Sequence, residues 1–373
     1  MDTKRNNKSE EVRDRLIQYL RQREKQRPSG MRENVKDEIW SRVAKEHSKK
    51  RMRLVYRRWS VAVASVAAVI VLAVVFYPGD DWSQYPVSDI SRFKVIASAS
   101  HNSNDIQLIV PGSGEIVVDV EDKKIVHSND GMVCVGDKAM NVSSESAKGK
   151  QEEMIQLWVP YGKHIQLELA DGSVLDVNAG TRVIYPKTFR KDCREIYVEG
   201  EIFIDVQHTH NVPFIVHTNH YDVNVLGTAF NIMAYKDEMQ SEIVLLRGKV
   251  EVKDQKEQRY LMKPDEKVSF NGTMYAGKEK VDASEYVAWK NGLFILKGEP
   301  LNHVLERLTR YYNRKIECDP VLSASIPIYG KIDVNESLED VLTSIALTSG
   351  VEWKKLGSSY QLLRKQRLDN KND

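Results

Sequence analysis

Residues 164–177 read HIQLELADGSVLDV, and apolar and polar residues alternate on both sides of Asp171-Gly172. Two alternating runs joined by Asp-Gly are typical of a β-hairpin, because Asp and Gly tolerate the backbone angles of a two-residue turn. Alternation places every second side chain on one face, so each arm would bury one face and expose the other. The stretch therefore predicts antiparallel β structure.

Short apolar runs of the same kind continue beyond this hairpin. They predict strands at residues 195–198, 202–206, 214–217, 223–226, 243–246 and 250–252, with Gly200, Gly227 and Gly248 at or near the junctions. Many short strands with almost no helix are typical of a sandwich or a barrel-like sheet. We expect an all-β domain at 151–255, a β region before it at 79–150, and a β extension and linker after it at 256–288.

The pattern changes again beyond residue 288. Helical spacing of Leu and Val appears at residues 300–312 and 337–349, and short apolar runs lie around both segments. The order of these elements predicts a small α+β domain, β-α-β-β-α-β, at residues 289–364. Residues 365–373 are predicted to be a disordered tail.

One stretch of the chain carries no charge. Residues 59–77 read WSVAVASVAAVIVLAVVFY, with Trp59 and Tyr77 at the two ends. A helix of 19 residues spans about 28 Å, close to the hydrocarbon thickness of a bilayer, and aromatic rings favour the two interfaces. We expect a transmembrane helix at 59–78. A buried helix of a soluble protein is the alternative, although the stretch shows no polar face.

The charges on the two sides of this stretch predict its orientation. Residues 1–58 carry 19 Lys and Arg against 9 Asp and Glu, whereas the remaining residues carry 36 against 44. Positive charge stays on the cytoplasmic side of a membrane. We therefore expect a single-pass protein with its N-terminus in the cytoplasm. The basic run at 49–53 could instead contact nucleic acid, but its place beside the apolar stretch argues against that interpretation.

The N-terminal 58 residues predict two short helices with apolar faces. Helical spacing relates the apolar residues of 10–26, and then those of 31–43. Two such helices bury little area alone, so we expect a cytoplasmic segment that binds a partner through a helix in a groove. Its predicted contact residues are Leu16, Leu20, Ile39, Trp40 and Val43. The alternative is that the helices only pack on one another.

The sequence contains no catalytic or metal-binding signature that is more convincing than a structural role. Three cysteines exclude a disulfide-dense scaffold and a four-cysteine zinc site. Four histidines, at 208, 210, 217 and 220, are close in sequence but lack the spacing and accompanying ligands of a metal centre. We predict a protein that is not an enzyme and that needs neither a cofactor nor a metal.

Five ordered motifs carry a resemblance to a known family. They are LADGSVLDVNAG at 169–180, YPKTF at 185–189, REIYVEGEIF at 194–203, PFIVHT at 213–218 and VLGTAFN at 225–231. Together they resemble the core of FecR-type transmembrane regulators. Residues 289–363 are similar to the secretin/TonB short N-terminal type of domain that ends many of these proteins in Bacteroidetes-like bacteria.

The resemblance implies an anti-sigma factor in cell-surface signalling. It implies a multidomain inner-membrane protein whose cytoplasmic segment binds an extracytoplasmic-function sigma factor. Its periplasmic part would receive a signal from the signalling domain of a TonB-dependent outer-membrane transducer. Intramembrane or periplasmic proteases are further implied partners, and direct contact with nucleic acid is not. A membrane-tethered glycan-binding module, or an anchored hydrolase, would be the alternative function.

The pair Gly227-Thr228 has two interpretations. Some relatives are thought to cleave themselves at this pair, since a Thr hydroxyl can attack the preceding Gly carbonyl and form an ester that water opens. Gly leaves that carbonyl uncrowded. The other interpretation, which we favour, is a Gly-Thr turn between two strands.

Overall fold

The structure is a computed structural model with two compact units, Met1–Asp81 and Trp82–Asp373. Of the first unit it describes only Arg15, Ile17, Gln18, Arg21 and Gln22, which are helical. Of the second it describes Phe93 and residues 103–111, 114–119, 124–128, 131–136, 138–141 and 153–365. No helix among these described residues is long and apolar enough to cross a membrane.

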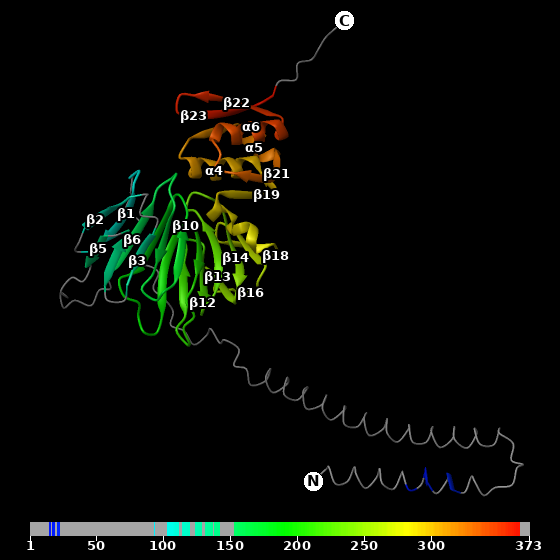
Figure 1. The fold of residues 1–373 in the computed structure, drawn as a ribbon. Helices are drawn as coiled ribbons and strands as arrows, with labels where there is room; N and C mark the ends of the chain where they lie inside the picture. The colour runs from blue at the N-terminus through cyan, green and yellow to red at the C-terminus, as the bar shows by residue number, and fades with distance from the viewer. Residues whose placement is uncertain are drawn as a thin grey trace, which may run out of the picture. The chain divides into compact units, whose positions relative to one another are not determined.

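Eighteen described strands form a β domain (Figure 1). Their bounds are β1 Ile106–Val110, β2 Gly114–Val118, β3 Lys124–His127, β4 Met132–Val135, β5 Lys138–Asn141, β6 Met154–Val159, β7 Ile165–Glu168, β8 Val174–Val177, β9 Thr181–Pro186, β10 Arg194–Asp205, β11 Phe214–His217, β12 Tyr221–Val225, β13 Ala229–Ala234, β14 Gln240–Arg247, β15 Val250–Asp254, β16 Arg259–Met262, β17 Glu266–Asn271 and β18 Met274–Lys280.

The strands pair into two layers that share one long strand. Sheet A has the order β2-β1-β6-β9-β10-β11-β12-β15-β16. Sheet B has the order β5-β4-β3-β7-β8-β10-β13-β14-β17-β18. All of these pairs are antiparallel except β3–β7 and β10–β11. The first half of β10 belongs to sheet A and its second half to sheet B.

Strand β10 changes sheets at Gly200. This residue has a φ of 126°, and a Cβ there would lie 2.4 Å from the Thr181 hydroxyl oxygen and 2.7 Å from the Thr181 Cα. Only glycine fits such a close approach. The sequence pattern predicted two separate strands on either side of Gly200, and the structure joins them into one.

A single apolar core fills the space between the two sheets. Both halves of β10 contribute to it, with Ile196 and Val198 from sheet A and Ile202 and Ile204 from sheet B. The predicted hairpin is confirmed, because β7 and β8 pair antiparallel around Asp171-Gly172. Its inward residues, Leu167 and Leu175, are fully buried in this core.

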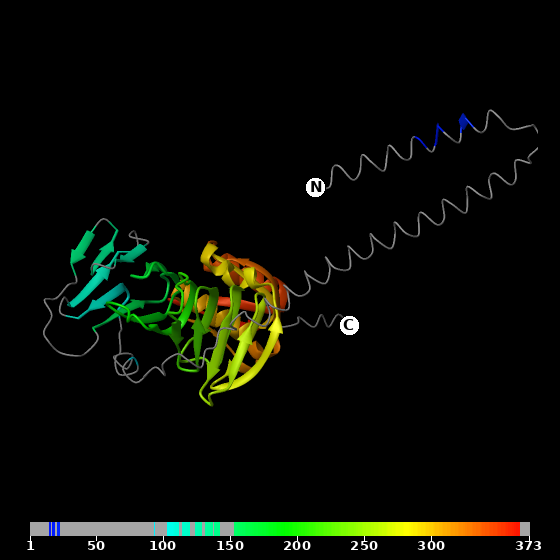
Figure 2. The ribbon, with the colours of Figure 1, turned by 90° about the horizontal axis from the view of Figure 1, so that it is seen from below.

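The C-terminal part has its own core and lies against sheet B (Figure 2). After the 3-10 helix η3 (Ala283–Asn291) its elements are β19 Leu293–Pro300, α4 Leu301–Tyr312, β20 Ile316–Cys318, α5 Pro320–Ser325, β21 Pro327–Asp333, α6 Leu338–Ser349, β22 Val351–Leu356 and β23 Ser359–Arg364. β19 pairs with β21, whereas β20, β23 and β22 form a separate sheet. The apolar faces of α4 and α6 fill the core between them.

The sequence predicts a multidomain membrane protein with a short cytoplasmic α-helical segment, one transmembrane helix, a periplasmic all-β domain and a C-terminal βαββαβ domain. This predicted fold class is wrong. The described residues form one large β domain, Ile106 to Lys280, with a small C-terminal part. That part has the order β-α-β-α-β-α-β-β, because α5 and β22 were not foreseen. The predicted helix at 59–78 lies outside the described residues. The proposed domain boundaries stay a prediction.

Candidate functional site

A chain of buried and half-buried polar side chains joins the β domain to the C-terminal part. The carboxylate of Glu201 accepts hydrogen bonds from Asn178 Nδ2 at 2.7 Å and from Asn231 Nδ2 at 3.1 Å. The side-chain oxygen of Asn231 accepts a hydrogen bond from the Trp289 indole at 3.1 Å. We call these four residues the polar socket. Each amide is oriented by two bonds, so the socket holds the indole in one direction.

The strand register explains why the socket forms. Phe203 of β10 pairs with Asp176 of β8 and with Asn231 of β13, so side chains of three neighbouring strands share the outer face of sheet B. Glu201 lies on the same face two residues earlier, because side chains alternate along a strand. Phe203 packs against the apolar core of the C-terminal part. The outer face of sheet B is therefore a docking face.

Lys290 makes a second contact on this face. Its ammonium lies 2.7 Å from an Asp176 carboxylate oxygen and 3.9 Å from the centre of the Phe203 ring. The Lys290 ammonium thus combines an ion pair with a cation–π contact. Together these two contacts favour one conformation of the Lys290 side chain.

Arg310 of α4 makes a third contact, with the loop that follows β13. Its guanidinium is buried, lies 3.9 Å from the centre of the Tyr235 ring and forms an ion pair with Glu238. Its backbone carbonyl accepts a hydrogen bond from the Gly162 amide at 2.8 Å. Because α4 belongs to the C-terminal part and the other groups to the β domain, this residue fixes the two parts together.

The environment of Glu238 shifts its titration toward neutral pH. Burial raises the pKa of its carboxyl to about 7 despite the opposing charge of Arg310, and the neighbouring carboxylates of Glu306 and Asp237 add to the rise. The Glu238–Arg310 pair therefore changes its charge in the physiological pH range.

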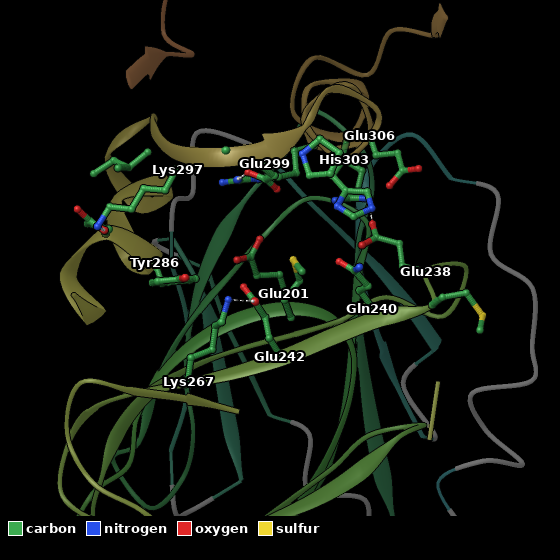
Figure 3. Close-up of a pocket in the computed structure, with 18 of the residues that line it drawn as sticks. Glu201, Glu238, Gln240, Glu242, Lys267, Tyr286, Lys297, Glu299, His303 and Glu306 are labelled. Atoms are coloured by element: carbon green, nitrogen blue, oxygen red, sulfur yellow. Dashed lines mark hydrogen bonds and ion pairs between the residues drawn. The ribbon is translucent and has the colours of Figure 1, made fainter. Parts of the chain in front are cut away.

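A cleft of about 780 Å³ lies between the β domain and the C-terminal part (Figure 3). Figure 3 shows Glu201 and Glu242 on the sheet side of this cleft and Lys297, Glu299 and His303 on the opposite side. Seven of its lining residues are acidic and four are Lys or Arg. Each of the four cations pairs with a carboxylate of the same cleft, in the pairs Lys267–Glu242, Lys297–Glu285, Arg307–Glu299 and Arg310–Glu238.

Of these four ion pairs, only Arg310–Glu238 joins the C-terminal part to the β domain. Lys267–Glu242 lies within the β domain, and the other two pairs lie within the C-terminal part. The cleft lining holds three more carboxylates than Lys and Arg side chains, seven against four. Among the described residues, no group of three or more His, Cys, Asp or Glu side chains is placed to hold a metal ion. Interfaces between domains that are polar and charged permit relative motion more readily than large apolar interfaces do. The junction is therefore a candidate site for a change in the relative position of the two parts.

Comparison with known proteins agrees with this two-part organisation. The family model described as FecR protein matches residues 155–251, and the model described as FecR, C-terminal matches residues 293–361. Two crystal structures of a "putative anti-sigma factor" from Parabacteroides distasonis are 36% identical in sequence to this chain, with a TM-score of 0.54. The matched region covers 57% of this chain, and 99% and 100% of the two crystallised chains. The chain belongs to the FecR family. A comparison with curated proteins gives no match.

Membership of the FecR family supports the role of an anti-sigma regulator. The motifs quoted from the sequence contain three members of the polar socket, namely Asn178, Glu201 and Asn231. Sequence reasoning gave them no role. The signal that could have indicated one is their position, because each is a polar residue that follows or interrupts an apolar strand. Trp289 was used only to mark the start of the last domain.

Gly227 and Thr228 of this FecR-family chain lie between β12 and β13. A Cβ on Gly227 would come within 2.5 Å of the His208 Cβ, so a larger residue does not fit. The buried Thr228 hydroxyl donates to the Lys249 carbonyl at 3.0 Å, and the Thr228 carbonyl accepts from the Val206 amide at 2.9 Å. These contacts suit the turn interpretation. Self-cleavage at this pair stays the untested alternative to the turn.

The other predicted site residues, Leu16, Leu20, Ile39, Trp40 and Val43, lie outside the described residues. The four histidines have separate surroundings: the rings of His208 and His210 meet edge to face at 4.8 Å, whereas His217 bonds Asp222 at 2.8 Å. Burial lowers the pKa of His220. The three cysteines, Cys134, Cys193 and Cys318, are free thiols.

Proposed function

We propose that this chain restrains a sigma factor and releases or activates it when its C-terminal part is engaged from outside. The observation that carries the proposal is the pairing of a FecR region with a FecR C-terminal region in a fold shared with a "putative anti-sigma factor". The junction of the two regions supports a role in signalling, because it is rich in polar and charged contacts, and such interfaces permit relative motion of the two parts.

The proposed cytoplasmic partner is an extracytoplasmic-function sigma factor, held by residues 1–58. The support is the pair of apolar helical faces in that segment, which contains Leu16, Leu20, Ile39, Trp40 and Val43. Short amphipathic helices gain stability when an apolar groove of a partner covers them. In this proposal the chain resides at the bacterial inner membrane, with these residues inside and the β domain in the periplasm. The flanking charges of residues 59–77 support that location.

The proposed periplasmic partner is the signalling domain of a TonB-dependent outer-membrane transducer. The C-terminal part offers a strand for it: β21 pairs only with β19 among the described strands. Tyr329 in that strand is 72% exposed. An unpaired strand edge of seven residues can accept a partner strand through main-chain hydrogen bonds. Proteases of the membrane or periplasm would act after this engagement.

The test replaces apolar residues of the cytoplasmic segment with Asp. Leu16→Asp and Trp40→Asp place a charge on the proposed contact faces, so transcription from promoters of the cognate sigma factor should change at least tenfold. Gln18→Asp, a change at a polar position of the first segment, serves as the matched control. Membrane content of each variant is measured by immunoblot. Unchanged transcription in both variants at normal protein level would refute the proposed contact.

A further inference from the structure

A row of side chains crosses the outer face of sheet A, on the side away from the core. The strand register aligns Gln156 with Ile184, Ile184 with Tyr197, Tyr197 with His217, and His217 with Asp222. The row thus runs across five neighbouring strands, β6, β9, β10, β11 and β12. Because aligned residues of neighbouring strands point to the same face, these side chains form one continuous surface.

This surface is more buried than the outer face of a two-layer sheet usually is. Such a face is normally wet and polar, with apolar residues confined to the inner face. Here Ile184 is 0% exposed, and Tyr197 and His217 are each 1% exposed. Ile184 and Tyr197 also belong to a small apolar cluster that is separate from the core between the sheets. Something therefore covers the middle of the row.

The described residue that lies on the row is Phe93. It is fully buried, and its cluster partners are Met154, Ile184 and Tyr197. Its ring is stacked with Tyr197 at 6.3 Å between centroids and lies 5.6 Å from the ring of His217. Hydrogen bonds also hold two residues of the pocket wall in place. The Tyr197 hydroxyl donates to Asn219 at 2.8 Å, and His217 Nδ1 bonds Asp222 at 2.8 Å. Phe93 thus occupies an aromatic pocket whose walls are already held in place.

We infer that this pocket is a binding site for the chain's own Phe93, and that Phe93 fastens the chain that leads into the β domain to the outer face of sheet A. The C-terminal part covers the outer face of sheet B through Phe203 and the polar socket, so each outer face has its own intramolecular partner. The inference goes beyond the proposed function and holds whatever partner the N-terminal residues bind. Loss of the Phe93 contact should therefore raise the rate of proteolysis at the peptide bonds beside it, since proteolysis follows the population of the open state.

The sequence around Phe93 provides a direct readout. Arg92 and Lys94 flank it, and trypsin cleaves after both residues. Fully burying a Phe side chain is worth enough to shift an equilibrium about tenfold to a hundredfold, so Phe93→Ala should raise the tryptic cleavage rate at these two sites by that factor. The full chain in detergent is digested briefly, and mass spectrometry assigns each cut. Phe93→Leu should show a smaller rise, because Leu retains most of the apolar area.

Two further variants separate release from general loss of stability. Met154→Ala trims the pocket wall from the other side and should raise cleavage at the same two sites. Val117→Ala changes a residue of β2 that is 61% exposed and should leave cleavage at the wild-type rate. The melting midpoint of the β domain is measured for each variant. If Phe93→Ala unfolds the β domain, the cleavage rate of Met154→Ala tests the inference in its place.

Two results would overturn the inference. One is an unchanged cleavage rate at Arg92 and Lys94 in Phe93→Ala with a folded β domain, or in Met154→Ala if the first variant unfolds. The other is an equal rise in Val117→Ala, which would mean that the cuts report general loosening instead of release from the pocket.

Discussion

The indole nitrogen of Trp289 donates a hydrogen bond to the side-chain oxygen of Asn231, 58 residues earlier in the chain, at 3.1 Å. Asn231 lies within the region matched as FecR protein, and Trp289 lies four residues before the region matched as FecR, C-terminal. The bond is buried, so each group depends on the other for its partner. This pair links the two characteristic regions of the family.

Replacing Trp289 by Phe tests that link. Phe keeps most of the apolar contact but removes the N–H donor, which leaves the Asn231 oxygen buried without its partner. We expect a loss of about 1–3 kcal/mol in the free energy of unfolding, measured with urea. A double-mutant cycle with Asn231→Ala should give a coupling energy of about 1 kcal/mol. Trp353→Phe is the control, because that indole bonds Thr343 in an exposed position, and it should cost far less.

The charge of Glu238 should make the junction sensitive to pH. Its pKa is about 7 in the folded chain, above its ordinary value, so the folded state holds a proton that the unfolded state has lost. The free energy of unfolding should therefore fall as pH rises from about 5 to 7, by no more than about 3 kcal/mol, and level off above. Glu238→Gln should abolish this slope. The exposed change Glu317→Gln should keep it, and a slope that survives in Glu238→Gln would contradict the assignment.

Arg310 should not tolerate replacement by Lys. A lysine ammonium keeps the charge but cannot lie flat on the Tyr235 ring while pairing with Glu238. We expect Arg310→Lys to lower the free energy of unfolding by about 1–3 kcal/mol. Arg247→Lys is the matched change, because Arg247 pairs with Asp205 on the surface, and such pairs contribute less than about 1 kcal/mol. Equal effects of the two changes would show that Arg310 acts as an ordinary surface charge.

Thr228 should contribute to stability through its hydroxyl. Thr228→Val keeps the shape of the side chain but removes the donor to the Lys249 carbonyl, at an expected cost of about 1 kcal/mol. Thr228→Ser keeps the donor and should cost less. On the turn interpretation, the denatured wild-type chain runs as one band of 42.8 kDa on a gel. Two bands from the wild-type chain, with a single full-length band from Thr228→Val, would instead establish cleavage at this pair.

The local signals of the sequence were reliable where one residue type determines the backbone. Asp171-Gly172 predicted the hairpin, and apolar spacing predicted α4 and α6 to within about one residue of their bounds. The helix α5 was missed because six residues are too few to show a helical period. The pair Asp319-Pro320 nevertheless indicates where α5 begins. The Asp319 side chain caps the Leu322 amide, and Pro320 occupies the first turn.

The sequence alone did not show which distant strands pair with one another. Gly200 indicated a break between two strands, but only the approach of Thr181 shows that it is a bend within one strand. The polar socket needed the same information, because Asn178, Glu201 and Asn231 come together only through the register of β8, β10 and β13. The sequence does not show the charge of the cleft for a related reason: its carboxylates and cations come from segments far apart in the chain, on both the β domain and the C-terminal part.

The central claim is that the N-terminal segment holds a sigma factor, and affinity capture from native membranes tests it most directly. The baits are the full-length chain, residues 1–58 alone, and both with Leu16→Asp and Trp40→Asp. We predict that both unmodified baits retain the same extracytoplasmic-function sigma factor, identified by mass spectrometry, and that the double variant retains less than a tenth as much. Absence of any sigma factor from both unmodified baits, or equal retention by the variant, would contradict the claim.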